Sequence, residues 1–214
     1  MPDPSLFRRI VLVLMLALAF PAFPGIYDDI LAAANKDDTA QVIDLLKRGM
    51  DVNTADPSGN TLLIIAARNG NPDLLEFLLR NRSNISKRNS YGDSAIMIAA
   101  LRGHAAIVRR LLDAGADVRN DGWNALHYSA YNGHTEIVRM LVGHKADLDA
   151  AAPNGQTALM LAASMGRIDA VKILIDADAD MDLEDYEGRT AIMLAQKAGH
   201  LNVVEYLRSE GAYE

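Results

Sequence analysis

The sequence predicts an all-α solenoid, a single curved array of about six helix–turn–helix units joined by β-hairpin turns. The first observation is an internal repeat: five similar segments carry a leading glycine at positions 59, 92, 122, 155 and 188, spaced by 33, 30, 33 and 33 residues. The second is that Leu, Ile and Val follow each segment three or four positions apart, which is typical of a helix with one buried face. One such unit cannot bury its apolar side alone, so neighbouring units are expected to stack.

Residues 1–19, ahead of the repeats, have the layout of a secretory signal peptide. Arg8 and Arg9 precede an apolar run from Ile10 to Phe20, about half of the roughly 20 residues that a membrane-spanning helix needs. Ala17-Leu18-Ala19 offers a small-x-small cleavage motif. We therefore expect cleavage after Ala19, export to the periplasm and no stable membrane span afterwards. Secretion from the cell, or anchoring by an uncleaved N-terminal segment, are the alternatives.

The repeat domain is expected to span residues 26–214, because QVIDLLKRGMD at 41–51 forms an earlier copy of the pattern. Its expected units are approximately 26–54, 55–87, 88–117, 118–150, 151–183 and 184–214. The expected core takes residues that recur at one position of each helix: Leu63, Leu78, Ile96, Leu111, Leu126, Leu141, Leu159, Leu174 and Ile192.

Each unit contains signals for the start and end of its two helices. The first helix is expected to begin after a residue whose side chain accepts a hydrogen bond from a free backbone N–H: Thr61, Ser94, Asn124, Thr157 or Thr190. Gly49, Gly115 and Gly211 suit the left-handed turn that ends the second helix. Arg82, Lys145 and Asp178 replace glycine there, and a non-glycine residue in that conformation costs about 1 kcal/mol.

The period and the motifs TALMLAASMG, NALHYSAYNGH and LLDAGADV resemble the ankyrin repeat family, over roughly residues 26–214. Together with the leader, the chain looks like an exported bacterial ankyrin protein. The resemblance implies that His127 ties adjacent turns together, and that His104, His134 and His200 bond their local turns. Where Ile64, Met97, Met160 and Met193 replace the first of these histidines, that link is expected to be missing. The shorter segment at 117–123 is expected to leave a notch in the row of hairpin tips.

The family resemblance also implies where a partner binds: at the hairpin tips and the exposed side of the first helices. In that register the aromatic and neighbouring residues gather over the middle units, and Trp123 and Tyr131 are expected at the centre. The predicted partner-binding residues are Tyr91, Leu101, Arg102, Trp123, Tyr131, Asn132, Met165 and Tyr186.

Composition narrows the class of function. The chain has 214 residues, a net charge of −7, no cysteine and 6% aromatic residues. An acidic chain lacks the overall basic charge of a general nucleic-acid binder, and without cysteine there is no disulfide, thiolate metal site or cysteine nucleophile. No metalloprotease, nucleophile-elbow or phosphate-loop motif occurs. We expect a monomer that is not an enzyme, needs no cofactor or metal, and binds another protein in the envelope or outside the cell. Its negative charge favours a basic partner.

Two further functions remain open as alternatives. One is a secreted effector that acts on a host protein. The other is a divalent-metal-binding or enzymatic protein that uses the acidic run 176–187, whose carboxylates fall at calcium-loop positions. Met181 stands where that loop needs glycine, and the repeat register already explains the segment as a helix end followed by a hairpin.

Overall fold

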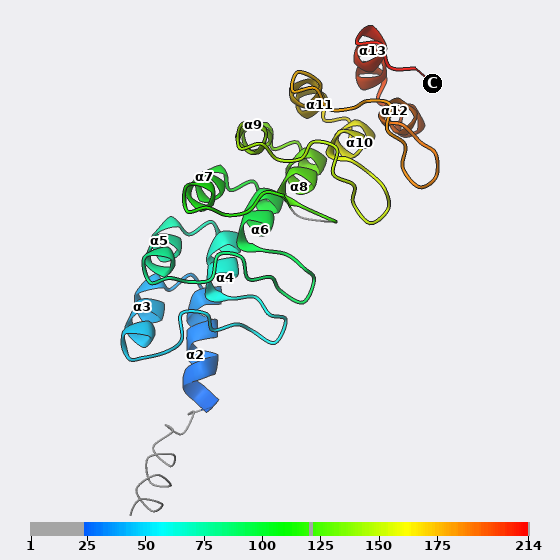
Figure 1. The fold of residues 1–214 in the computed structure, drawn as a ribbon. Coiled ribbons are helices and arrows are strands. Elements are labelled where there is room, and N and C mark those ends of the chain that lie inside the picture. The colour runs from blue at the N-terminus through cyan, green and yellow to red at the C-terminus, as the bar shows by residue number, and fades with distance from the viewer. Residues whose placement is uncertain (1–23, 120–121, 214) are drawn as a thin grey trace, which may run out of the picture.

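A computed structural model describes residues 24–119 and 122–213, and within them it confirms the all-α solenoid. The helices form two rows, with hairpin loops projecting from the side of the first row (Figure 1). The predicted leader, 1–19, lies outside the described residues. In the described ranges, no helix is both long enough and apolar enough to span a bilayer.

Every unit contributes one helix to each row. The first helices are α2 (Pro24–Asn35), α4 (Leu62–Asn69), α6 (Ala95–Arg102), α8 (Ala125–Asn132), α10 (Ala158–Ser164) and α12 (Ala191–Ala198). The second helices are α3 (Thr39–Lys47), α5 (Pro72–Arg80), α7 (Ala105–Asp113), α9 (Thr135–Gly143), α11 (Ile168–Ile175) and α13 (Leu201–Ser209).

The core lies between the two rows and continues from unit to unit. All of the core residues predicted from the sequence are at most 2% exposed. Alanines of the first helices, such as Ala66 and Ala67, are fully buried and allow neighbouring helices to approach closely. Burial of this continuous apolar layer is the main force that holds the units in one array.

The predicted capping residues precede α4, α6, α8, α10 and α12, but not all of them cap. Thr61, Asn124 and Thr157 accept a hydrogen bond from the N–H three residues later. The expectation is wrong for Ser94 and Thr190, whose hydroxyls make no capping bond and are buried without a hydrogen-bond partner among the described residues. Nothing in the structure explains this difference.

The connecting hairpins are tight turns with almost no strand. The described residues contain a single isolated bridge, between Ala55 and Thr61. Four tips, including the one with this bridge, are closed by a backbone hydrogen bond from one N–H to the carbonyl four residues later, donated by Asp56, Asn89, Ala152 and Asp185.

Left-handed residues end the second helices as predicted. Arg82, Lys145 and Asp178 have φ values of 61°, 59° and 66°. A further non-glycine residue, Asp37, has φ 64° at the end of the first helix of unit one, where the other units carry glycine. Because glycine adopts these φ values without steric cost and other residues do not, the backbone is strained at these four positions.

Candidate functional site

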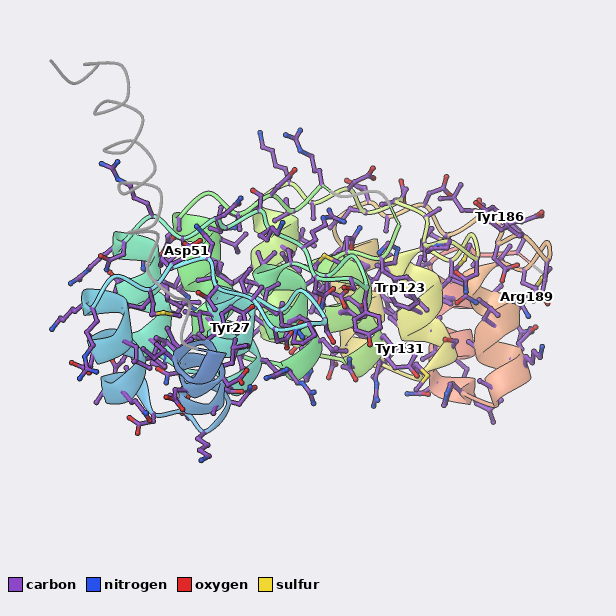
Figure 2. The ribbon with its side chains drawn as sticks, turned by 90° about the horizontal axis from the view of Figure 1, so that it is seen from below. Tyr27, Asp51, Trp123, Tyr131, Tyr186 and Arg189 are labelled. Atoms are coloured by element: carbon purple, nitrogen blue, oxygen red, sulfur yellow. The ribbon has the colours of Figure 1, made fainter. Side chains whose placement is uncertain are left out.

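The hairpin tips and the first-helix row form one side of the array, which we call the tip-side face (Figure 1). Most of the predicted partner-binding residues lie on the tips or at the C-terminal ends of these helices. Figure 2 shows Trp123, Tyr131 and Tyr186 along this part of the molecule. The structure therefore places them along the same side of the array, although their individual environments differ.

Three tyrosines and one arginine of the predicted set are available to a partner. Tyr91 and Tyr186, at the tips of units three and six, are 80% and 77% exposed. Tyr131, in the last turn of α8, is 38% exposed. Arg102 ends α6 with an exposed side chain, and its guanidinium has no hydrogen-bond or ion-pair partner among the described residues.

The remaining helix-end residues are less accessible. Leu101, Asn132 and Met165 are half-buried. Asn132 Nδ2 donates to the carbonyl oxygen of Tyr128 at 3.0 Å and to that of Leu101 at 3.5 Å. The bond to Tyr128 lies within α8, and the bond to Leu101 joins the end of α8 to the end of α6. Asn132 therefore helps to hold these two helix ends together, whereas Leu101 and Met165 add apolar surface to the face.

Trp123, which was expected at the centre of the face, packs against neighbouring side chains of its own unit. Its half-buried ring stacks on Tyr128, with centroids 5.2 Å apart, and meets His127 edge-on at 5.7 Å. Tyr128 in turn donates its hydroxyl to Asp93 Oδ1 of the preceding unit at 2.9 Å. Trp123 thus packs against a link between units three and four.

The environment of Tyr128 keeps its hydroxyl protonated. Burial and the neighbouring Asp93 carboxylate both raise the pKa of Tyr128 far above its usual value. The phenol therefore remains a donor to Asp93 throughout the physiological pH range.

Adjacent tips are fastened in two pairs. In units two and three, the Ser90 N–H donates to the Ser58 carbonyl at 2.8 Å, and Asn89 Nδ2 donates to Asn60 Oδ1 at 2.9 Å. In units five and six, the Tyr186 N–H donates to the Asn154 carbonyl at 3.4 Å. The predicted notch at unit four includes residues 120–121, which lie outside the described residues.

His127 has the structural role that the resemblance implied. It is buried, its Nδ1 accepts from the Asn124 N–H at 3.2 Å, and its Nε2 donates to the Ala150 carbonyl at 2.9 Å. Burial lowers its pKa, so the imidazole is neutral and both nitrogens are engaged. His127 therefore joins its helix to the next loop and is not free for catalysis.

Two of the histidines that precede the second helices make a different contact from the one expected. His104 Nε2 and His200 Nε2 donate to the carbonyls of Arg68 and Ser164, each at 3.1 Å. These carbonyls belong to the ends of α4 and α10, so the bonds cross to the preceding unit instead of closing the local turn. The His200 ring lies against Gly166, where an added Cβ would come within 2.6 Å of Nδ1.

Within the acidic run 176–187, Asp185 is engaged in turn contacts. Asp185 is buried, and its carboxylate accepts from the Glu187 and Arg189 N–H groups at 2.9 and 3.0 Å and from Arg189 Nη2 at 2.6 Å. Burial by itself raises the pKa of Asp185, but the bonds from Arg189 and Glu187 outweigh it and hold the pKa below its usual value. No group of three or more His, Asp or Glu side chains in the described ranges is arranged to hold a metal ion.

Comparison with known proteins identifies the fold family. A family model for ankyrin repeats (3 copies) matches residues 30–121, 63–152 and 146–213. The chain is 36% identical over 96 residues to the nuclear factor NF-kappa-B p105 subunit of Gallus gallus, covering 41% of this chain and 10% of that protein. It is 35% identical over 86 residues to the B-cell lymphoma 3 protein homolog of Mus musculus, covering 40% and 19%.

A shorter match, 43% identical over 54 residues, is to the ankyrin repeat domain-containing protein 29 of Danio rerio, covering 25% of this chain and 18% of that protein. The chain thus spans a fifth or less of the length of these relatives. Because the family model matches well over half of the chain, and the described helices repeat in its register, the chain belongs to the ankyrin repeat family.

Proposed function

We propose that this chain is a non-enzymatic module that binds another protein through its tip-side face. The observation that carries the proposal is the row of exposed Tyr91, Tyr131 and Tyr186 together with Arg102, which has no partner among the described residues. Tyrosine and arginine are among the residues that most often anchor protein interfaces.

The surrounding contacts favour a rigid binding surface. The tip pairs and the bonds from His104 and His200 fix unit three to unit two and unit six to unit five. A face that is ordered before binding loses little conformational entropy when a partner arrives. In this proposal, Trp123 and Asn132 hold the face in shape and the three tyrosines make the main contacts.

The N-terminal residues support a location for the partner. Arg8, Arg9 and the apolar run from Ile10 to Phe20 favour export, and Ala17-Leu18-Ala19 favours cleavage before Phe20. We propose that the module acts as a monomer in the cell envelope and that its partner is an envelope or secreted protein. Mass spectrometry of the chain from an envelope fraction tests this: a mature form starting at Phe20 is expected, and an intact chain in the cytoplasmic fraction would contradict export.

In-cell cross-linking and capture test the binding role. The parent is compared with a variant carrying Tyr91→Ala, Tyr131→Ala and Tyr186→Ala, and with Tyr213→Ala as the matched control. Tyr213 is 79% exposed but lies in the C-terminal tail. A protein captured by the parent and the control, and lost in the folded triple variant, is expected. Equal capture by all three would contradict the proposed face.

A further inference from the structure

The start of α8 contains a titratable side chain that the proposed binding role does not use. His127 is 1% exposed and is the third residue of this helix. Its Nδ1 accepts from the Asn124 N–H at 3.2 Å, and its Nε2 donates to the Ala150 carbonyl at 2.9 Å. Because a backbone N–H can only donate and a carbonyl can only accept, the two bonds together require a neutral imidazole with its proton on Nε2.

A second proton on this ring has no acceptor in the folded protein. It would bind Nδ1, so that an N–H of the imidazolium would point at the N–H of Asn124. The hydrogen bond at the start of α8 would be lost, and a positive charge would be buried there, which costs free energy. The folded position of the His127 ring therefore excludes the protonated form.

The charges around the ring do not offset this cost. Asp147, an exposed residue of the turn after α9, favours the imidazolium, as do two backbone carbonyls, but burial outweighs them and lowers the pKa of His127. Of the neighbouring helices, α10 has no titratable residue, and the charged residues of α9 and Arg102 at the end of α6 have exposed side chains. Asp93, which precedes α6, accepts from the neutral Tyr128 hydroxyl.

Unit four differs from its neighbours at this position. The corresponding residues of units two, three, five and six do not titrate: Ile64, Met97, Met160 and Met193. In unit five the Met160 Sδ accepts from the Thr157 N–H at 3.5 Å, which is the bond that His127 Nδ1 makes in unit four. Among these five units, acid can therefore break this bond only in the fourth.

We propose that His127 is a pH-sensitive switch, whose protonation opens the start of α8 and loosens the part of the tip-side face that unit four supplies. The opening displaces Trp123, whose ring meets His127 edge-on at 5.7 Å, and Tyr131, one helical turn further along α8. Release of a partner by acid rests on the proposed function, whereas the opening itself does not.

The sign of the pH dependence follows from the burial of His127. Its pKa is lowered in the folded protein, so the open state takes up a proton at a higher pH than the folded state does. The closed form is therefore fully favoured above the usual histidine pKa of about 6.5. Below that value, each pH unit shifts the equilibrium toward the open form by up to about tenfold, until the pKa of the folded form is reached.

Trp123 reports on the switch, because it is the single tryptophan of the chain. Its fluorescence is recorded on the full-length chain from about pH 8 to about pH 4.5, a range that spans the usual histidine pKa. The variants are His127→Met, which copies the residue of unit five, and His144→Gln as the matched control, because His144 is exposed after α9.

In the parent and in His144→Gln, the emission should fall and move to longer wavelength below about pH 6.5, because an imidazolium quenches the indole and water then reaches it. His127→Met should show no change in that range. Hydrogen exchange of the parent gives a readout that needs no variant. The protection factors of the first turn of α8 should fall by up to about tenfold per pH unit, and those of α4 should stay constant.

Four results would overturn parts of the inference in distinguishable ways. The same emission change in His127→Met would assign the titration to another group near Trp123. Constant emission and constant α8 protection in the parent would show that no switch operates. An equal loss of protection in α4 and α8 would show general acid unfolding. Capture of a partner that does not change with pH, while α8 opens, would overturn the release step alone. Failure to capture any partner would contradict the proposed function and leave the opening standing.

Discussion

The link between Tyr128 and Asp93 offers a sharp test of how units three and four are held together. Tyr128→Phe removes the hydroxyl that donates to Asp93 Oδ1 at 2.9 Å and leaves the ring stacked on Trp123. A hydrogen bond to a charged group contributes about 1.5–3 kcal/mol. Asp93 retains 9% exposure, so water can partly replace the donor. We therefore expect the lower part of that range, about 1.5–2 kcal/mol.

This loss is measurable by thermal and urea unfolding. For a domain of this size, 1 kcal/mol corresponds to about 2–4 °C, so the melting temperature should fall by about 3–8 °C. Tyr91→Phe is the control, because its exposed side chain makes no hydrogen bond in the described residues. In a double-mutant cycle, adding Asp93→Ala to Tyr128→Phe should recover part of the lost free energy of unfolding, because no buried carboxylate is then left without its hydrogen-bond donor. Strict additivity, or equal effects of Tyr128→Phe and Tyr91→Phe, would refute the reasoning.

Three further predictions concern stability. Gly166→Ala should lower the free energy of unfolding by about 2–3 kcal/mol, since it combines left-handed backbone strain with loss of the His200 contact. Gly199→Ala, at φ 77° with no neighbour near its Cβ, should lower the free energy of unfolding only by the strain. An equal loss in both variants would be inconsistent with the contact. Asp178→Gly should raise the free energy of unfolding by about 0.5 kcal/mol, because the backbone strain relieved in the folded protein outweighs the conformational entropy that glycine adds to the unfolded chain. A lower melting temperature would contradict this. The pKa of Asp185 is lowered in the folded protein, so its contribution to stability is present above the unfolded pKa of about 3.9 and is lost as pH falls through the folded pKa. Asp185→Asn should therefore be less stable than the parent at pH 7 and approach the stability of the parent in acid. A difference in stability that does not change with pH would contradict the account.

Features that depend on local spacing were predictable from the sequence. The leading glycines predicted five units and the earlier copy of the pattern at 41–51 predicted a sixth, while the apolar positions three and four apart predicted the buried face, including Leu126 and Leu159. The positive φ of Arg82 follows because it stands where other units carry glycine in the same turn. Such features are determined within one unit, where the pattern is complete.

Features that depend on contact between units were not predictable. The side chain of His104 could reach its own turn or the carbonyl of Arg68, and only the packing of the two units selects the second. Trp123 occupies a tip position by register, yet its ring stacks on Tyr128. The side-chain rotamer and the packing of neighbouring residues determine both contacts, and a repeat pattern contains information on neither. The candidate face was therefore predicted from the sequence, while the contacts of its residues are known only from the structure.

The distribution of charge shows a related limit of sequence reasoning. Net charge is a property of the whole chain, but a partner meets only one face of it. The absence of acidic residues from α4 to α12 of the first row is visible in the sequence once the helices are assigned. The pairing of Asp185 and Glu187 with Arg189 is not, because it depends on how the turn folds.

Site-specific photocross-linking in the producing cells tests the central claim most directly, namely that the tip-side face meets the partner. A benzophenone amino acid is placed in turn at positions 91, 131 and 186, and at position 213 as the exposed control. Adducts of one mass at positions 91, 131 and 186, and none at 213, are the predicted result. An adduct at 213 with none at the three face positions would contradict the account.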